Sequence, residues 1–193
     1  RRCDLTNAAA TSWVWLMCVV VVDHSDDRTA TRSVRIAYRP IPTQPTVTDL
    51  VGLHELFVGG VRGLVAADHP LTTLPCEAAE ESFYAAMADG IDAELAWVTA
   101  DGEQTADSDA VFAELFEYAR HGLELSGLSS DAIDNYLAPI EARVAAGLTP
   151  SAWKKQQVRE RLADGDDFEN AIEGMQQEYI QRSRESDSFA EWL

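Results

Sequence analysis

The chain has 193 residues, of which 46% are hydrophobic, and its 33 acidic residues against 15 basic ones give a formal net charge of −18. This length and composition suit one large globular unit with a sizeable core, or one unit with an appendage, while the negative charge excludes non-specific nucleic-acid binding, because it repels phosphate. Abundant acids with only two lysines are typical of a halophilic protein, whose self-repulsion is screened by molar salt; the alternative is an ordinary acidic protein.

Two strands are expected first. Residues 12–22 are rich in valine and tryptophan, which is typical of a buried strand, and this apolar run is too short for a membrane helix of about 20 residues. Residues 32–39 alternate in polarity and place Arg35, Ala37 and Arg39 on one face. A polar turn joins the two segments, so an antiparallel pair is the simplest arrangement, and the prolines from position 40 onward end the second strand.

Helices are expected in the rest of the chain. The first begins at Thr46 and has a helical apolar period, and its four glycines predict close packing against a neighbouring element. Further helices are expected at residues 75–89, 108–125, 130–146, 150–164 and 167–184, with a short extended piece at 91–98. The predicted fold class is therefore α+β, with one unit at residues 1–150 and a helical appendage at 151–193.

Several polar residues are expected to have ordinary structural roles. The three cysteines are odd in number and widely spaced, which predicts neither a metal site nor a disulfide framework and is typical of a reducing cytosol. The acidic residues Glu77, Glu80 and Glu81 are expected to form a solvated helix face. Lys154 and Lys155 are expected to lay their stems over apolar surface.

The candidate binding residues are Arg35 and Arg39. Two guanidinium groups on one face of a sheet can clamp a carboxylate or a phosphate, because each group can bind such an anion through two hydrogen bonds. The alternative is a pair of surface arginines on a half-exposed sheet. Residues 1–45 carry six arginines and four aspartates, so this basic segment either faces an anionic ligand or pairs with acidic surface elsewhere.

Two segments resemble the carboxylate–amine ligase branch of the glutamate–cysteine ligase family. They are Thr11–Trp15, with the sequence TSWVW, and Val34–Thr46, with the sequence VRIAYRPIPTQPT. In that branch a Thr-x-Trp-Arg-Trp strand pairs with an Arg-Ile-Glu-x-Arg strand that ends in a proline-rich turn. The glycine-rich helix that follows and the segment Phe83–Leu95, with the sequence FYAAMADGIDAEL, also resemble the family. The likeness covers roughly residues 5–150.

The resemblance implies that residues 1–150 form the C-terminal part of a catalytic domain with a glutamine-synthetase-like sheet. It implies ATP-dependent ligation of glutamate to cysteine or another amine in the cytoplasm, with ATP and Mg²⁺ as cofactors, no nucleic-acid or membrane partner, and a possible homo-oligomer. It makes Arg39 the catalytic residue, whose guanidinium would contact the phosphate or the substrate carboxylate. It also assigns Arg35, Thr11 and Trp15 to substrate or nucleotide binding. Ala37 stands where the family has a glutamate for Mg²⁺, and alanine offers no oxygen ligand, so no metal ligand is assigned.

Departures from the family pattern leave two alternatives open. Besides Ala37, the residues Val14 and Met17 stand where the family tends to have arginines. The first alternative is therefore a non-catalytic relative, and the second is an unrelated acidic module whose helices after Pro150 bind a partner protein. The chain begins without methionine and almost at once enters a core strand, so we expect a fragment or a degenerate copy of the ligase.

Overall fold

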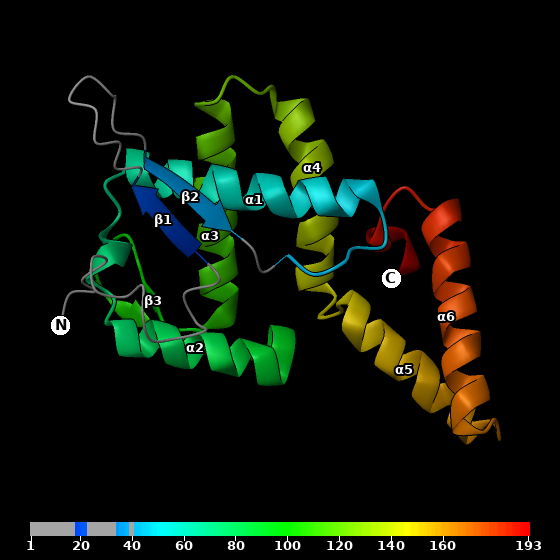
Figure 1. Ribbon diagram of the computed structural model, residues 1–193. Coiled ribbons are helices and arrows are strands. Elements are labelled where there is room, and N and C mark those ends of the chain that lie inside the picture. The colour runs from blue at the N-terminus through cyan, green and yellow to red at the C-terminus, as the bar shows by residue number, and fades with distance from the viewer. Residues whose placement is uncertain (1–17, 23–33, 39–40) are drawn as a thin grey trace.

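The computed structural model describes residues 18–22, 34–38 and 41–193. Within these residues the fold is mainly helical with small antiparallel sheets, which is α+β in the broad sense (Figure 1). Strand β1 (Cys18–Val22) pairs antiparallel with β2 (Val34–Tyr38), so the predicted pairing of the first two strands is confirmed. The remainder of both predicted strands lies outside the described residues.

Among the described residues six α-helices follow in chain order; the first begins one residue after its predicted start at Thr46, and the other five begin and end within one residue of their predicted bounds. They are α1 (Val47–Ala66), α2 (Cys76–Asp89), α3 (Ser108–Glu124), α4 (Ser130–Ala145), α5 (Pro150–Ala163) and α6 (Phe168–Glu185). Short elements lie between and after them, namely the 3₁₀ turns η3 (Pro70–Thr73), η4 (Gly90–Asp92) and η5 (Phe189–Trp192) and the hairpin β3 (Trp97–Val98) with β4 (Gln104–Thr105).

The extended piece predicted at residues 91–98 is only partly correct. Gly90 ends α2 with φ of 67°, a left-handed conformation that favours glycine. The backbone amide of Ala93 then bonds to the carbonyl of Gly90 over 3.4 Å and closes the turn η4. The strand β3 therefore begins only at Trp97.

Glycines allow α1 to cross α3 and α4 at close range, as Figure 1 shows. A Cβ on Gly59 would lie 2.4 Å from the carbonyl oxygen of Ala119, and one on Gly63 would lie 1.9 Å from that of Tyr118. These distances leave no room for a side chain, so the predicted close packing is confirmed. Buried side chains fill the angle between these helices, among them Ala119, Leu123, Ile133 and Leu137.

The C-terminal helices have an aromatic core of their own. Helices α5 and α6 pack against each other, and η5 closes the end of the pair (Figure 1). The core consists of Trp153, Met175, Tyr179, Phe189 and Trp192. Trp192 contacts Trp153 and Tyr179 edge to face at centroid distances of 5.2 and 5.3 Å. Helices α5 and α6 thus form a packed hairpin.

Two further features bear on the sequence-based expectations. Cys76, the first residue of α2, is disulfide-bonded, whereas the odd number and wide spacing of the cysteines predicted no disulfide framework and favoured a reducing cytosol. Spacing along the chain does not report which residues meet in the fold. In the part of the chain that the structure describes, no helix is both long enough and apolar enough to cross a membrane.

Candidate functional site

The predicted binding strand is described in part. Arg35 lies opposite Val21 in the antiparallel register of β1 and β2, and Ala37 lies opposite Val19. Arg39, which the resemblance makes the catalytic residue, lies outside the described residues, and so do Thr11 and Trp15. Of the predicted site residues, the structure therefore describes Arg35 alone, by its place in the strand pair.

A buried ion pair fixes the chain directly after this strand. Asp49, in the first turn of α1, is fully buried, and the Arg143 side chain, near the end of α4, is 7% exposed. Asp49 Oδ1 contacts Arg143 Nη2, while Oδ2 accepts hydrogen bonds from the Thr46 hydroxyl over 2.8 Å and from the Phe189 amide over 3.0 Å. Arg143 Nη1 donates to Gln44 Oε1 over 2.8 Å. We call this group the Asp49 junction.

In the Asp49 junction the protein itself binds both oxygens of the Asp49 carboxylate, whereas Arg143 Nε has no hydrogen-bond partner among the described residues. Both carboxylate oxygens of Asp49 already accept hydrogen bonds, and the Arg143 guanidinium lies 5.1 Å over the Phe189 ring. Burial lowers the pKa of Arg143, and the charge and hydrogen bond of Asp49 oppose that shift. Burial also raises the pKa of Tyr179, with a further contribution from Asp49 that Arg143 opposes. The junction is therefore a structural connection between α1, α4 and η5.

A second polar cluster surrounds His69. The side chain of His69 is fully buried, and its Nδ1 accepts a hydrogen bond from the Leu71 amide over 3.1 Å. The ring proton must then lie on Nε2, which faces Glu114 Oε1 at 3.6 Å. Glu114 also accepts hydrogen bonds from the Trp97 indole and from the Ala100 amide. Nε2 forms no hydrogen bond with another described residue, and the His69 ring lies edge to face against Tyr118 of α3 at a centroid distance of 4.9 Å, so His69 packs η3 against α3.

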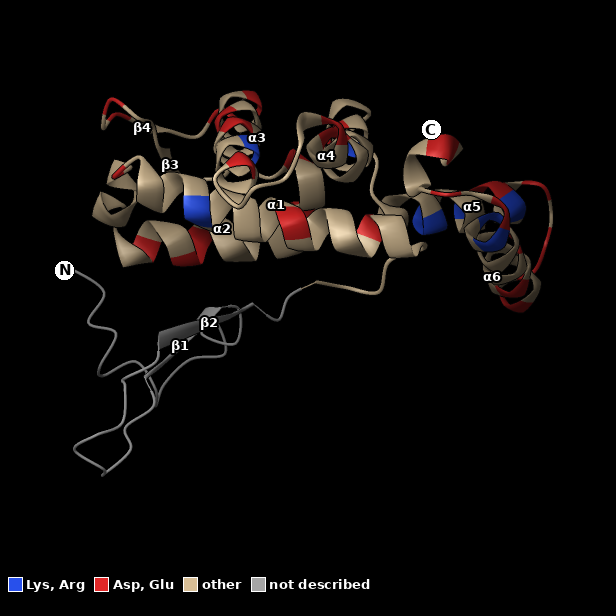
Figure 2. Cartoon of the chain, turned by 90° about the horizontal axis from the view of Figure 1, so that it is seen from above, with Lys and Arg blue, Asp and Glu red and all other residues tan. Residues whose placement is uncertain are grey.

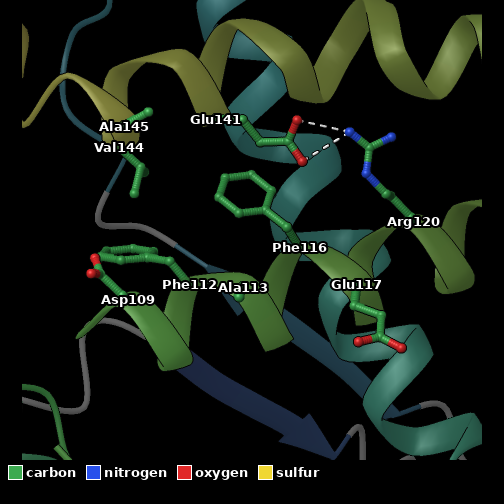
Figure 3. A pocket seen from close by; sticks show the side chains of 9 residues that line it. All are labelled: Asp109, Phe112, Ala113, Phe116, Glu117, Arg120, Glu141, Val144 and Ala145. Atoms are coloured by element: carbon green, nitrogen blue, oxygen red, sulfur yellow. Dashed lines mark hydrogen bonds and ion pairs between the residues drawn. The ribbon is translucent and has the colours of Figure 1, made fainter. Parts of the chain in front are cut away.

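A groove of about 460 Å³ runs between α3 and α4 (Figure 3). Phe112, Phe116 and Val144 supply much of its apolar lining, and Asp109 and Glu117 add carboxylates. Figure 3 shows the Glu141 carboxylate reaching from α4 to the Arg120 guanidinium on α3.

Arg120 is not available to bind an anionic ligand in this groove. Its Nη2 donates to both oxygens of Glu141 over 2.8 Å, and its Nη1 donates to Asp134 over 2.5 Å. The hydrogen bond to Glu141 raises the pKa of Arg120, Asp134 adds to the increase, and burial opposes it. With its one cation neutralised, the groove has an apolar floor and an acidic rim, which does not suit a phosphate group.

No metal centre is evident in the described ranges 18–22, 34–38 and 41–193. Among these residues, no three His, Cys, Asp or Glu side chains gather as a metal ion would require. Ala37 lies on the same strand as Arg35. Its side chain has no oxygen atom, which is why the sequence assigned no metal ligand at this position.

No family model, no curated protein and no solved structure matches this chain.

Sequence analysis missed the Asp49 junction because its members lie far apart in the chain. Thr46 and Asp49 were recognisable as a helix start, and the Thr46 hydroxyl does accept from the Asp49 amide over 3.2 Å. Nothing in the sequence pairs Asp49 with Arg143, since a basic residue in the last turn of a helix is explained by the helix dipole alone. A still longer separation, 140 residues, lies between Asp49 and Phe189.

Proposed function

We propose that this chain is the C-terminal part of an ATP-dependent carboxylate–amine ligase related to the glutamate–cysteine ligases. The observation that carries the proposal is the segment Val34–Thr46, which has the family's arginine strand followed by its proline-rich turn. The antiparallel pairing of β1 with β2 is compatible with the paired strands of that family. Such an enzyme would act in the cytoplasm, on glutamate and on cysteine or another amine.

The roles of individual residues follow from the chemistry of the proposed reaction. ATP, when bound, supplies the phosphoryl group that activates the side-chain carboxylate of glutamate. Arg39 and Arg35 would bind phosphate and carboxylate oxygens, because guanidinium groups form paired, charge-assisted hydrogen bonds with both. The described residues do not fit a Mg²⁺ site, since Ala37 has no oxygen ligand and no acidic triad gathers among them.

The Asp49 junction supports the proposal because it anchors Gln44 and Thr46 in the proline-rich segment that follows the arginine strand. Gln44 is bound by Arg143 and Thr46 by Asp49, only a few residues after β2 ends at Tyr38. A binding strand works best when the elements that carry it are rigid. We therefore assign Asp49 and Arg143 as positioning residues of the proposed site, acting through the proline-rich turn.

Nucleotide binding by arginine variants tests the proposal. We would express the protein from its complete gene and measure ATP binding in molar KCl by calorimetry. Arg39→Ala should abolish binding, and Arg35→Ala should weaken it, because each removes one cation from the expected face of the strand. Arg32→Ala removes the same charge from the other expected face and is the matched control. Equal binding by all three variants and the wild type would remove these arginines from any nucleotide site.

Ala37 specifically favours a second candidate, a non-catalytic relative that binds ligands without turnover. This relative would bind ATP and yet release no ADP when glutamate, an amine and Mg²⁺ are supplied. Ala37→Glu restores the missing carboxylate and should then restore turnover. ADP release by the wild-type protein would exclude this second candidate, whereas binding without turnover would support it.

A further inference from the structure

A groove between α5 and α6 combines apolar and cationic residues. Its volume is about 340 Å³. The residues that line it are Lys154, Lys155, Val158 and Arg159 of α5 and Phe168, Ile172 and Met175 of α6. Phe168 is 66% exposed and Ile172 is 40% exposed. We call this surface the basic groove.

The cations of the basic groove are largely uncompensated. Helix α5 has four basic residues and one acidic residue, in a chain whose net charge is −18, and Figure 2 shows basic residues gathered on α5. Lys154 Nζ lies 3.8 Å over the Tyr179 ring, while Lys155 and Arg159 form no ion pair with any other described residue. An acid-rich protein that leaves these cations unpaired beside exposed apolar side chains offers a site for an acidic, amphipathic helix.

The chain carries such a helix itself. Helix α2 has no buried residue, and one of its faces combines acidic and apolar side chains. On that face Glu80, Tyr84 and Met87 follow one another at helical spacing, with Glu77 and Glu81 beside them. Tyr84 is 51% exposed and Met87 is 68% exposed. The prediction that the three glutamates form a solvated helix face agrees with their exposure.

We propose that α2 of one copy of this chain docks into the basic groove of a second copy. The two surfaces are complementary in charge and both expose apolar side chains, so contact would bury Tyr84 and Met87 against Phe168 and Ile172. Within one chain α2 and the α5–α6 pair lie apart in both Figure 1 and Figure 2. The contact therefore joins different patches of two copies, and it either closes into a ring or extends as a chain.

Charge-reversal variants of the full chain test this contact. The wild type should associate with increasing concentration in sedimentation velocity at moderate salt. Lys155→Glu with Arg159→Glu reverses the two cations of the groove that form no ion pair, and Glu80→Lys with Glu81→Lys reverses the charge of the α2 face. Each double variant should raise the dissociation constant by about tenfold or more, because several charge pairs become repulsive.

An equimolar mixture of the two double variants separates this head-to-tail contact from other forms of association. Each variant keeps one intact surface, and the two reversed surfaces are opposite in charge to each other, so the mixture should form heterodimers or larger mixed species that neither variant forms alone. The matched control is Asp101→Lys with Glu124→Lys, which changes the net charge by the same amount as the α2 variant but at exposed sites elsewhere. This control should associate like the wild type. Circular dichroism checks that every variant is folded.

The proposal is overturned by a wild type that stays monomeric at every concentration, by a mixture that forms neither heterodimers nor larger mixed species, or by a control that dissociates like the α2 variant. A monomeric wild type would leave the basic groove to an acidic helix of a different protein.

Discussion

Substituting Gly63 by alanine tests how tightly α1 packs on α3. The added Cβ would lie 1.9 Å from the carbonyl oxygen of Tyr118, whereas real Cβ contacts essentially never fall under 3.0 Å. The two helices would have to separate by about 1 Å, because a backbone carbonyl cannot rotate away as a side chain can. Typical overpacking costs about 1–3 kcal/mol, and we place this contact between backbones at about 3–5 kcal/mol. Alanine returns about 1 kcal/mol of helix propensity.

We therefore expect Gly63→Ala to lower the free energy of unfolding by about 2–4 kcal/mol. Gly60→Ala is the matched control on the same helix, since its Cβ would meet only the flexible end of Leu115 at 3.3 Å. That variant should match the wild type or gain up to about 1 kcal/mol. Urea unfolding in molar KCl, followed by circular dichroism, measures both. A Gly63→Ala variant within about 0.5 kcal/mol of the wild type, which is the usual effect of a surface substitution, would refute the close packing.

Two further predictions concern the Asp49 junction. Asp49→Ala should lower the free energy of unfolding in urea by about 3–5 kcal/mol, because Arg143 would remain buried without its counter-charge. The double variant Asp49→Ala with Arg143→Met should recover part of this loss. If the single and double variants lose the same free energy of unfolding, the two side chains do not interact. Tyr179→Phe should leave stability at pH 7 nearly unchanged, because the Tyr179 hydroxyl has no hydrogen-bond partner among the described residues. Folding raises the pKa of the Tyr179 hydroxyl, so the folded state favours the neutral hydroxyl. This contribution to the free energy of unfolding is complete below about pH 10, the usual pKa of tyrosine, and is lost as the pH rises through the raised pKa. Tyr179→Phe should therefore unfold at higher pH than the wild type in an alkaline titration, and an unchanged or lower midpoint would contradict this sign.

The sequence predicts the helices well because their ends are marked locally. Thr149 caps α5 with its hydroxyl, which accepts from the Ala152 amide over 3.2 Å, and Pro150 occupies the first helical position. Gly147 and Gly165 follow α4 and α5 with φ of 62° and 105°, the left-handed conformation that ends helices. Each of these signals lies within a few residues of the boundary that it sets.

Long-range contacts could not be predicted in the same way. The sequence does not indicate that Phe189 bonds to Asp49, or that a histidine after α1 meets Glu114 of α3. Such contacts depend on how helices cross, and helix crossing depends on packing that no short sequence pattern encodes. For the proposed site, strand alternation places Arg35 on one face of β2, but no local pattern indicates which elements would complete a site around it.

The fate of the glutamate carboxylate oxygen tests the proposed ligase most directly. In the proposed reaction a side-chain oxygen of glutamate attacks the terminal phosphorus of ATP and releases ADP. The amine then attacks the acyl carbon, and phosphate leaves with that oxygen. Protein expressed from the complete gene, supplied with ATP, Mg²⁺, cysteine and glutamate labelled with ¹⁸O in its side chain, should release phosphate that carries one ¹⁸O for each amide formed. Unlabelled phosphate, or no phosphate, would contradict the account.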